Sequence, residues 1–206
     1  MPFTTLISAE QLRALIDADT PLLILDTSFD LVDVTAGERS YREGHIPGAR
    51  YVHLDRDLSA PKTGRNGRHP LPSREEFAAT AGRLGVTTQS QVVVYDRQGA
   101  MFAVRAWWML RWLGHAAVAV LDGGLAAWQA IGGAQGTTVP PAAHWTPYPP
   151  RAPLVRSVDA AAVMQSLGVA PLPDQRERAH AVTGELIGAI AERTRVRVEG
   201  QVEAAV

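Results

Sequence analysis

The amino-acid sequence predicts an α/β fold, with a parallel sheet flanked by helices on both faces. Short runs rich in Val, Ile and Leu alternate with longer segments of helical periodicity along residues 1–133. The apolar run at 92–95 lacks polar alternation, which is typical of a strand buried on both faces of a parallel sheet. A polar turn ending at Gly99 follows it, and the apolar segment from Ala100 predicts a helix packed on more than one side.

The composition supports one domain of ordinary size. Of the 206 residues, 46% are hydrophobic, so the chain can bury one good core and part of a second. A formal net charge of −1, with scattered Lys and Arg, argues against nucleic acid as a partner. Because the sequence shows no apolar run of about 18 residues and no basic leader segment, we expect no membrane span and a cytoplasmic location.

Cysteine does not occur in the chain. Its absence excludes disulfides, thiolate metal sites and a cysteine nucleophile within these residues. We therefore expect no metal and no other cofactor.

The amino-terminal elements are predicted from their caps and their apolar spacing. Ser8 begins a capping box that predicts a short amphipathic helix. A buried strand at 22–25 ends at Asp26, and the polar stretch after it predicts a surface loop with one helical turn before Tyr41. A further strand is predicted at 51–54.

The stretch Gly-His-Ile-Pro-Gly-Ala at 44–49 predicts a rigid turn, since Pro47 fixes φ and Gly48 allows a positive φ. His45, at the entry of this turn, is expected to bond the backbone and hold the turn rather than to act in catalysis. The polar, Gly-rich loop at 55–69 is long for a compact domain, and loops of this length are usually functional or mobile.

The rest of residues 1–133 repeats the alternation of strand and helix. Ser73 begins a second capped helix, which Gly85 ends. After the central strand and helix, a buried strand at 117–121 leads through a Gly-rich turn to a helix at 125–131.

Tryptophan and arginine side chains along these helices have structural interpretations. At helical spacing, we expect the following to be core residues: Trp107, Trp108, Trp112 and Trp128. Arg105 is expected to form a structural ion pair with a buried carboxylate, such as Asp26 or Asp122.

The composition changes after Gly133. Residues 134–153 contain six prolines from Pro140 onward and predict a semi-rigid linker between the domain at 1–133 and a segment at 154–206. A capped helix is predicted at 157–167, but the pattern weakens beyond it. About 50 residues cannot build another core of the size of the first, so we interpret 154–206 as an incomplete, truncated or divergent remnant of a second domain.

Three ordered motifs resemble the rhodanese family of sulfurtransferases. They are Y-x-x-x-H-I-P-G-A at 41–49, the strand ending in Tyr95-Asp96, and L-D-G-G-x-x-x-W at 121–128. Further segments resemble the amino-terminal half of the two-domain thiosulfate and 3-mercaptopyruvate sulfurtransferases: R-A-W-W-M-L-R at 105–111, Gly114-His115 and R-H-P-L-P at 68–72. The resemblance covers roughly Leu6 to Gly133.

The resemblance implies a division of labour between two halves. In this family the second half carries a cysteine in its active loop, which takes sulfur as a persulfide and passes it to a thiophilic acceptor. Asp96 stands at the equivalent position here, as is usual for the non-catalytic first half. A carboxylate would repel thiosulfate by roughly 4 kcal/mol at about 4 Å and an effective dielectric near 20. Asp96 therefore either faces a partner surface or, as we favour, caps the following helix.

Asp55 and His69 match positions that, in the mercaptopyruvate-type enzymes, reach across the domain interface. The resemblance implies an assisting pair that moves a proton through a hydroxyl of the other half, which suits a His–Asp pair near neutral pH. The alternative, two polar residues of a solvated loop, is equally well supported by the sequence.

We expect a sulfurtransferase-family protein that is inactive as written, because the active-loop cysteine and the second domain are missing. It would act on a small sulfur-containing anion only if a complete second domain were supplied. The alternative is a non-catalytic binding or regulatory module with a protein partner. A phosphatase of the same fold also needs the loop cysteine and is rejected.

The abrupt loss of the family pattern after residue 167 suggests a frameshift or a truncation. Sequencing the locus tests this, because the hypothesis requires an intact second domain in another reading frame.

Overall fold

The computed structural model describes residues 1–18, 20–143, 146–158, 162–163 and 165. The chain divides into two compact units, Met1–Leu154 and Val155–Val206. The first unit contains every helix and strand named below. The expected helix at 157–167 lies largely outside the described residues, and residues 174–206 lie wholly outside them.

The first unit is built on a five-stranded parallel sheet in the order β1-β5-β4-β2-β3. The strands are β1 (Leu6–Ile7), β2 (Leu22–Asp26), β3 (Arg50–Tyr51), β4 (Gln91–Tyr95) and β5 (Val118–Leu121). Every residue of β4 is buried, as its unbroken apolar run predicts. The sheet and its parallel pairing confirm the predicted α/β class.

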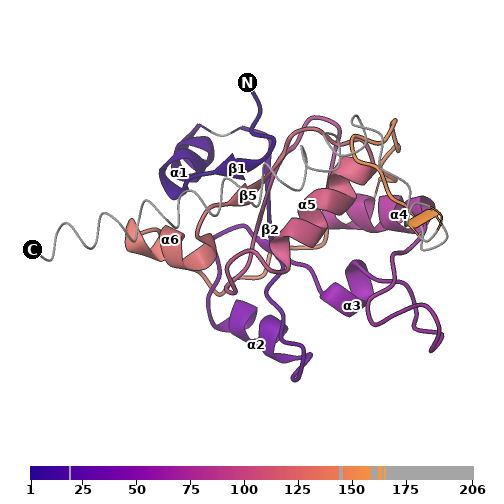
Figure 1. The fold of residues 1–206 in the computed structure, drawn as a ribbon. Coiled ribbons are helices and arrows are strands. Elements are labelled where there is room, and N and C mark those ends of the chain that lie inside the picture. Colours follow the sequence, from indigo (N-terminus) through magenta and orange to yellow (C-terminus); the bar gives the residue numbers. More distant parts are fainter. Residues whose placement is uncertain (19, 144–145, 159–161, 164, 166–206) are drawn as a thin grey trace, which may run out of the picture. The chain divides into compact units, whose positions relative to one another are not determined.

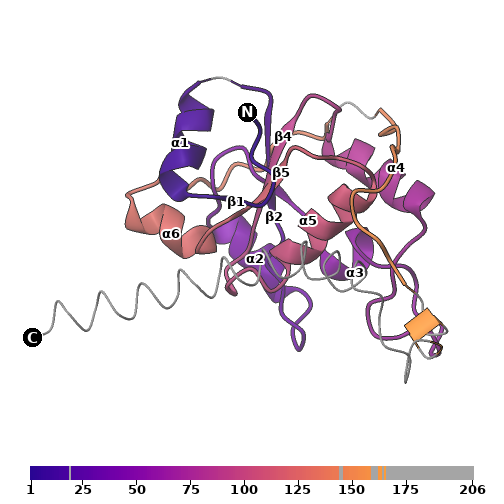
Figure 2. The ribbon, with the colours of Figure 1, turned by 45° about the horizontal axis from the view of Figure 1, so that its top comes forward.

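Helices cover both faces of this sheet. The helices are α1 (Ala9–Asp17), α2 (Ala36–Glu43), α3 (Leu54–Asp57), α4 (Arg74–Leu84), α5 (Ala103–Trp112) and α6 (Gly124–Ala130). Figure 1 and Figure 2 show α1 and α6 on one side of the sheet and α4 and α5 on the other. One core cluster joins alternate strand residues, including Ile24, Val93 and Leu121, to Leu12 of α1 and Trp128 of α6.

Two capping boxes are present as the sequence predicts. The Ser8 hydroxyl accepts from the Gln11 N–H at the start of α1, and the Ser73 hydroxyl accepts from the Glu76 N–H at the start of α4. Gly85 ends α4 with a φ of 91°, a conformation that glycine adopts without steric cost.

The prediction of a strand at 51–54 is wrong beyond Tyr51, where β3 ends. The chain bends into α3 instead, because His53 caps this helix: its Nδ1 accepts from the N–H groups of Asp55 and Arg56. A histidine cap is not among the usual sequence signals for a helix start. The short β1, which lies at the edge of the sheet and pairs with β5, was also not expected from the sequence.

Residues 134–154, predicted from composition as a linker over 134–153, lie within the first unit. Their described part contains no helix or strand, but the backbone of Gly136 exchanges two hydrogen bonds with that of His45, each 2.9 Å long. Tyr148 is buried and its hydroxyl lies 3.1 Å from Nδ1 of His115. The segment therefore packs on the domain rather than leaving it.

Candidate functional site

The Asp96 loop, residues 96–102, begins where β4 ends and leads into α5. Its first side chain is buried, and each carboxylate oxygen accepts two backbone N–H groups at 2.8–3.0 Å. The donors are Gln98 and Ala100 to Oδ1, and Phe102 and Ala103 to Oδ2. A ring of convergent N–H groups is an anion-binding arrangement. Here the Asp96 carboxylate occupies this ring. It accepts the N–H groups at the start of α5, which is the capping role that we favour.

The four bonds also set where α5 begins. The sequence predicts a helix from Ala100, but α5 starts at Ala103. Ala100 has a φ of 72°, and its N–H is directed to the Asp96 carboxylate instead of to a helical partner. The loop backbone is therefore shaped around the carboxylate.

A second buried carboxylate lies beside this loop, at the end of β2. Asp26 accepts the Ser28 N–H at 2.9 Å, and Nη2 of Arg97 lies 3.8 Å from its other oxygen. Burial raises the pKa of Asp26, and the hydrogen bonds from Ser28 and the charge of Arg97 oppose that rise. Arg97 also donates to the carbonyls of Ser40 and Gly44, so it fixes the loop to the end of α2.

Asp55 and His69 are brought together from α3 and from the long loop that follows it. Nδ1 of His69 lies 3.0 Å from Oδ1 of Asp55, and Nζ of Lys62 lies 3.5 Å from the same oxygen. Because the carboxylate accepts the Nδ1 proton, a neutral ring carries its lone pair on Nε2. That nitrogen is buried and has no hydrogen-bond partner among the described residues.

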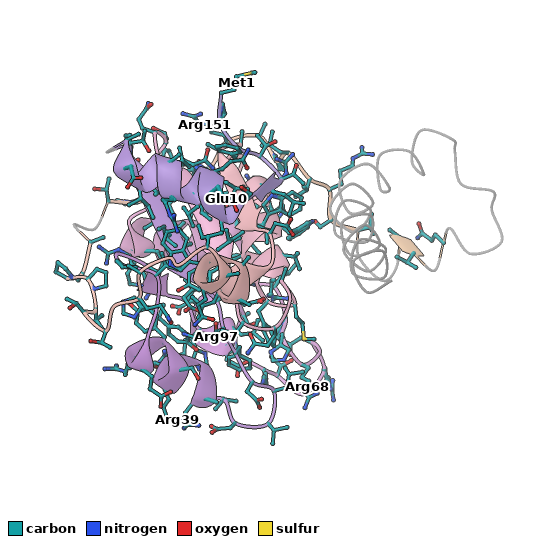
Figure 3. The ribbon with its side chains drawn as sticks, turned by 90° about the vertical axis from the view of Figure 1, so that its left-hand side faces the viewer. Met1, Glu10, Arg39, Arg68, Arg97 and Arg151 are labelled. Carbon is teal, nitrogen blue, oxygen red and sulfur yellow. The ribbon has the colours of Figure 1, made fainter. Side chains whose placement is uncertain are left out.

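The pair and the Asp96 loop are linked by aromatic rings. Phe29 lies edge-on to Phe102 of the loop at 5.6 Å between ring centroids, and edge-on to His69 at 6.4 Å. Between the described atoms of Asp96 and those of Asp55 or His69, no hydrogen bond is formed. The three predicted site residues thus share one edge of the sheet but form two separate groups. Figure 3 shows Arg97 and Arg68, from the two loops, in the half of the first unit that lies away from Met1.

The expected ion pair of Arg105 with Asp26 or Asp122 is wrong. Its guanidinium instead donates to three backbone carbonyls, those of Leu58, His69 and Pro70, at 2.8–3.4 Å. Carbonyl partners leave no trace in a sequence pattern, whereas a nearby carboxylate is easily suspected. Arg105 joins the two ends of the loop that carries His69.

The expected structural role of His45 is confirmed by its contacts. Nδ1 lies 2.7 Å from the Tyr41 carbonyl and Nε2 lies 3.1 Å from the Thr138 carbonyl. Among the tryptophans expected in the core, two are buried, Trp107 and Trp128. The expectation is wrong for Trp108 and Trp112, which are only partly buried and stack on each other at 5.7 Å.

Sequence reasoning missed Arg97, Phe29 and Phe102 as parts of this edge. The signal for Arg97 was its position directly after Asp96, but its partners are carbonyls of α2, distant in sequence. Both phenylalanines resemble ordinary core residues in the sequence. Only the fold brings their rings between the loop and the pair.

Within the described residues, no group of three or more His, Asp or Glu side chains is arranged to hold a metal ion. Nor does the described part of the chain contain a helix with the length and apolarity needed to cross a bilayer.

The sequence and the structure were compared with those of known proteins. The model of the rhodanese-like domain matches residues 8–131. A Pseudomonas aeruginosa protein named "Probable 3-mercaptopyruvate sulfurtransferase" is 49% identical over 134 residues, which cover 64% of this chain and 47% of that protein. The human 3-mercaptopyruvate sulfurtransferase is 45% identical over 125 residues, covering 58% of this chain and 40% of that one. The chain spans about half the length of the curated relatives it matches.

Solved structures of sulfurtransferases also resemble this chain. The Escherichia coli 3-mercaptopyruvate sulfurtransferase SseA matches with a TM-score of 0.66 and 29% identity, over 80% of this chain and 63% of that one. The Leishmania major 3-mercaptopyruvate sulfurtransferase matches with a TM-score of 0.60 and 26% identity, over 73% of this chain and 40% of that one. The family model covers more than half of the chain, and we conclude that the chain belongs to the rhodanese family and is homologous to its sulfurtransferases.

Proposed function

We propose that this chain is the non-catalytic half of a two-domain sulfurtransferase, and that residues 1–206 alone do not transfer sulfur. The reaction needs a thiolate that attacks the donor sulfur. With thiosulfate the S–S bond breaks, sulfite leaves and the thiolate becomes a persulfide; cyanide then takes the outer sulfur as thiocyanate and restores the thiolate. The chain has no cysteine to supply that thiolate.

The occupied N–H ring of the Asp96 loop is the observation that carries the proposal. In a catalytic loop such a ring stabilises a thiolate or persulfide. Here all four N–H groups are taken by a carboxylate, which cannot carry sulfur as a persulfide. The same negative charge opposes the approach of an anionic donor.

The Asp55–His69 pair supports an assisting role. Asp55 orients the ring, so that Nε2 of His69 is the atom that can accept a proton. A hydroxyl supplied by a cysteine-bearing second half is the group that we propose it serves, since Nε2 has no partner among the described residues. Asp55 then stabilises the imidazolium that forms.

A binding or regulatory module is the second candidate. Large apolar side chains are exposed in the segments that follow β2, β3 and β4: Leu31, Val32, Val34, Leu71 and Met101. Val32 is 96% exposed. Exposed apolar side chains around one edge favour contact with a protein surface.

Sulfur transfer from thiosulfate and from 3-mercaptopyruvate to cyanide tests both candidates. The purified chain should form no thiocyanate. The Asp96→Cys variant, which places a thiol in the loop, is assayed in parallel. Adding the separately expressed, cysteine-bearing half of a two-domain relative should restore transfer. His69→Gln should then lower the restored rate by about a hundredfold, whereas Arg65→Gln should not change it.

Turnover by the native chain alone would overturn the proposed inactivity. Binding of the added half without any transfer would favour the module. Equal restored rates for the native chain and His69→Gln would remove the pair from the mechanism.

A further inference from the structure

A cavity of about 480 Å³ lies at the β3 edge of the sheet, apart from the Asp96 loop and the Asp55–His69 pair. Its walls come from α2, β3, α3, the end of α4 and the segment at 139–140. Figure 1 and Figure 2 both show α3 between α2 and α4. Its volume falls in the range of small-molecule sites, and neither the Asp96 loop nor the Asp55–His69 pair lines it.

The charges on this cavity are unbalanced. Among the described residues, four guanidinium groups line it, those of Arg42, Arg50, Arg56 and Arg83, against two carboxylates, those of Glu38 and Asp57. The described part of the lining therefore carries an excess of two positive charges. A hollow lined mainly by one sign of charge concentrates the field and attracts ions of opposite sign.

The carboxylates use only part of the donor capacity of these arginines. Glu38 is shared by Arg42 and Arg56, each through one Nη2 at 2.8 Å, and Asp57 accepts from Nη2 of Arg83 at 2.9 Å. An arginine has five N–H donors, so most remain available. These three side chains are more than half exposed, and exposed ion pairs exchange partners at little cost.

Arg50 differs from the other three. Among the described residues it has no carboxylate partner, and its Nη1 donates to the Pro141 carbonyl at 2.7 Å. That bond holds the guanidinium at the cavity without neutralising it. Tyr51, Val139 and Pro140 supply the accessible, less polar part of the lining, which suits the body of an organic molecule.

We propose that this cavity binds a small organic dianion, with its phosphate or carboxylate groups paired to Arg50 and Arg42 and its body against Tyr51 and the segment at 139–140. The fork of a guanidinium matches both kinds of oxyanion. The site is independent of sulfur transfer.

Isothermal titration calorimetry with the full chain at low ionic strength measures binding and tests the proposal. The probes are phenyl phosphate and phthalate, which share an aromatic body and differ in their anionic groups, with phenol as the neutral control. At least one dianion should bind saturably at one site, and phenol should not bind. Tighter binding of phenyl phosphate would identify a phosphate ester, and tighter binding of phthalate a dicarboxylate, as the natural class.

Two cavity variants and one matched control separate a specific site from general attraction. Arg50→Gln should weaken binding about tenfold, and so should Arg42→Gln, in which Glu38 keeps Arg56 as its partner. Arg65→Gln removes the same charge from an exposed position outside the cavity and should change affinity by less than about twofold. No saturable binding of either dianion, equal binding of phenol, or an equal loss in Arg65→Gln would overturn the proposal.

Discussion

Gly124 lies directly against the Asp96 loop. It has a φ of 56°, and a β-carbon at this position would overlap the backbone carbonyl of Asp96. That carbonyl also accepts the Leu125 N–H at 3.1 Å. The second glycine of the Asp-Gly-Gly turn is therefore required by close approach as well as by its dihedral angle.

We expect Gly124→Ala to destabilise the fold by about 3 kcal/mol, from strain and displacement of the loop. Gly99→Ala is the matched control, because Gly99 has a φ of 72° with open space around it. This control should lower the free energy of unfolding by about 1 kcal/mol, because only the positive φ disfavours alanine there. Urea unfolding of both variants gives the two values, and equal losses would show that the approach to Asp96 is not the cause.

His115 should make stability depend on pH. Burial lowers its pKa below 6.5, and the charge of Arg151 acts in the same direction. The unfolded chain therefore binds a proton here at a pH where the folded chain does not. The contribution of His115 to the free energy of unfolding is fully present above about pH 6.5. It is lost as the pH falls toward the lower pKa that His115 has in the folded state.

Urea unfolding at pH 7.5 and pH 5.5 measures this effect. The native chain should lose more stability on acidification than His115→Gln, since the other histidines contribute to both proteins alike. The comparison concerns only the change with pH, because the variant also alters the bond to Tyr148. Identical changes would contradict a lowered pKa at His115.

At the scale of elements, Arg105 of α5 determines the position of the loop that carries His69. One guanidinium donates to the carbonyls at both ends of that loop, Leu58 on one side and His69 and Pro70 on the other. Arg105→Met should lower the free energy of unfolding by about 2 kcal/mol, because the charge-assisted bonds to the partly buried carbonyls of Leu58 and His69 are lost. The Pro70 carbonyl keeps the Ala60 N–H as its donor.

The same variant should increase amide hydrogen exchange across residues 58–70 more than elsewhere. Arg65→Met, which changes an exposed side chain within the loop, is the control and should leave exchange unchanged. A uniform increase over the whole domain would mean that Arg105 stabilises the fold generally rather than this loop.

The elements that the sequence predicted well are those set by local chemistry. The capping boxes at Ser8 and Ser73 involve residues three positions apart, so the sequence contains the whole interaction. The start of α5 could not be placed in this way, because it depends on a carboxylate seven residues earlier that takes the intervening N–H groups. The Asp55–His69 contact was expected only from resemblance, since it depends on how a long loop closes.

At the scale of the whole first unit, the segment at 134–154 completes the domain. His45 and Gly136 exchange backbone hydrogen bonds, and the N–H groups of Arg151 and Leu154 donate to the carbonyls of Leu113 and Arg111. A β-carbon at Gly82 of α4 would overlap the Thr146 carbonyl, and one at Gly114 would crowd the Ala152 carbonyl. Close packing of this kind indicates a structural part of the domain.

Truncated chains test where the domain ends. A chain of residues 1–154 should unfold cooperatively with a Tm close to that of residues 1–206, because it keeps every contact of the first unit. Ending the chain at Gly133 removes Tyr148 from His115 and removes two partners of His45, Gly136 and Thr138. It should lower the Tm by at least about 10 °C. Thermal unfolding followed by circular dichroism compares the three chains. If residues 1–133 proved as stable as residues 1–154, the composition would have placed the domain boundary correctly, and the contacts of the proline-rich segment would contribute little to folding.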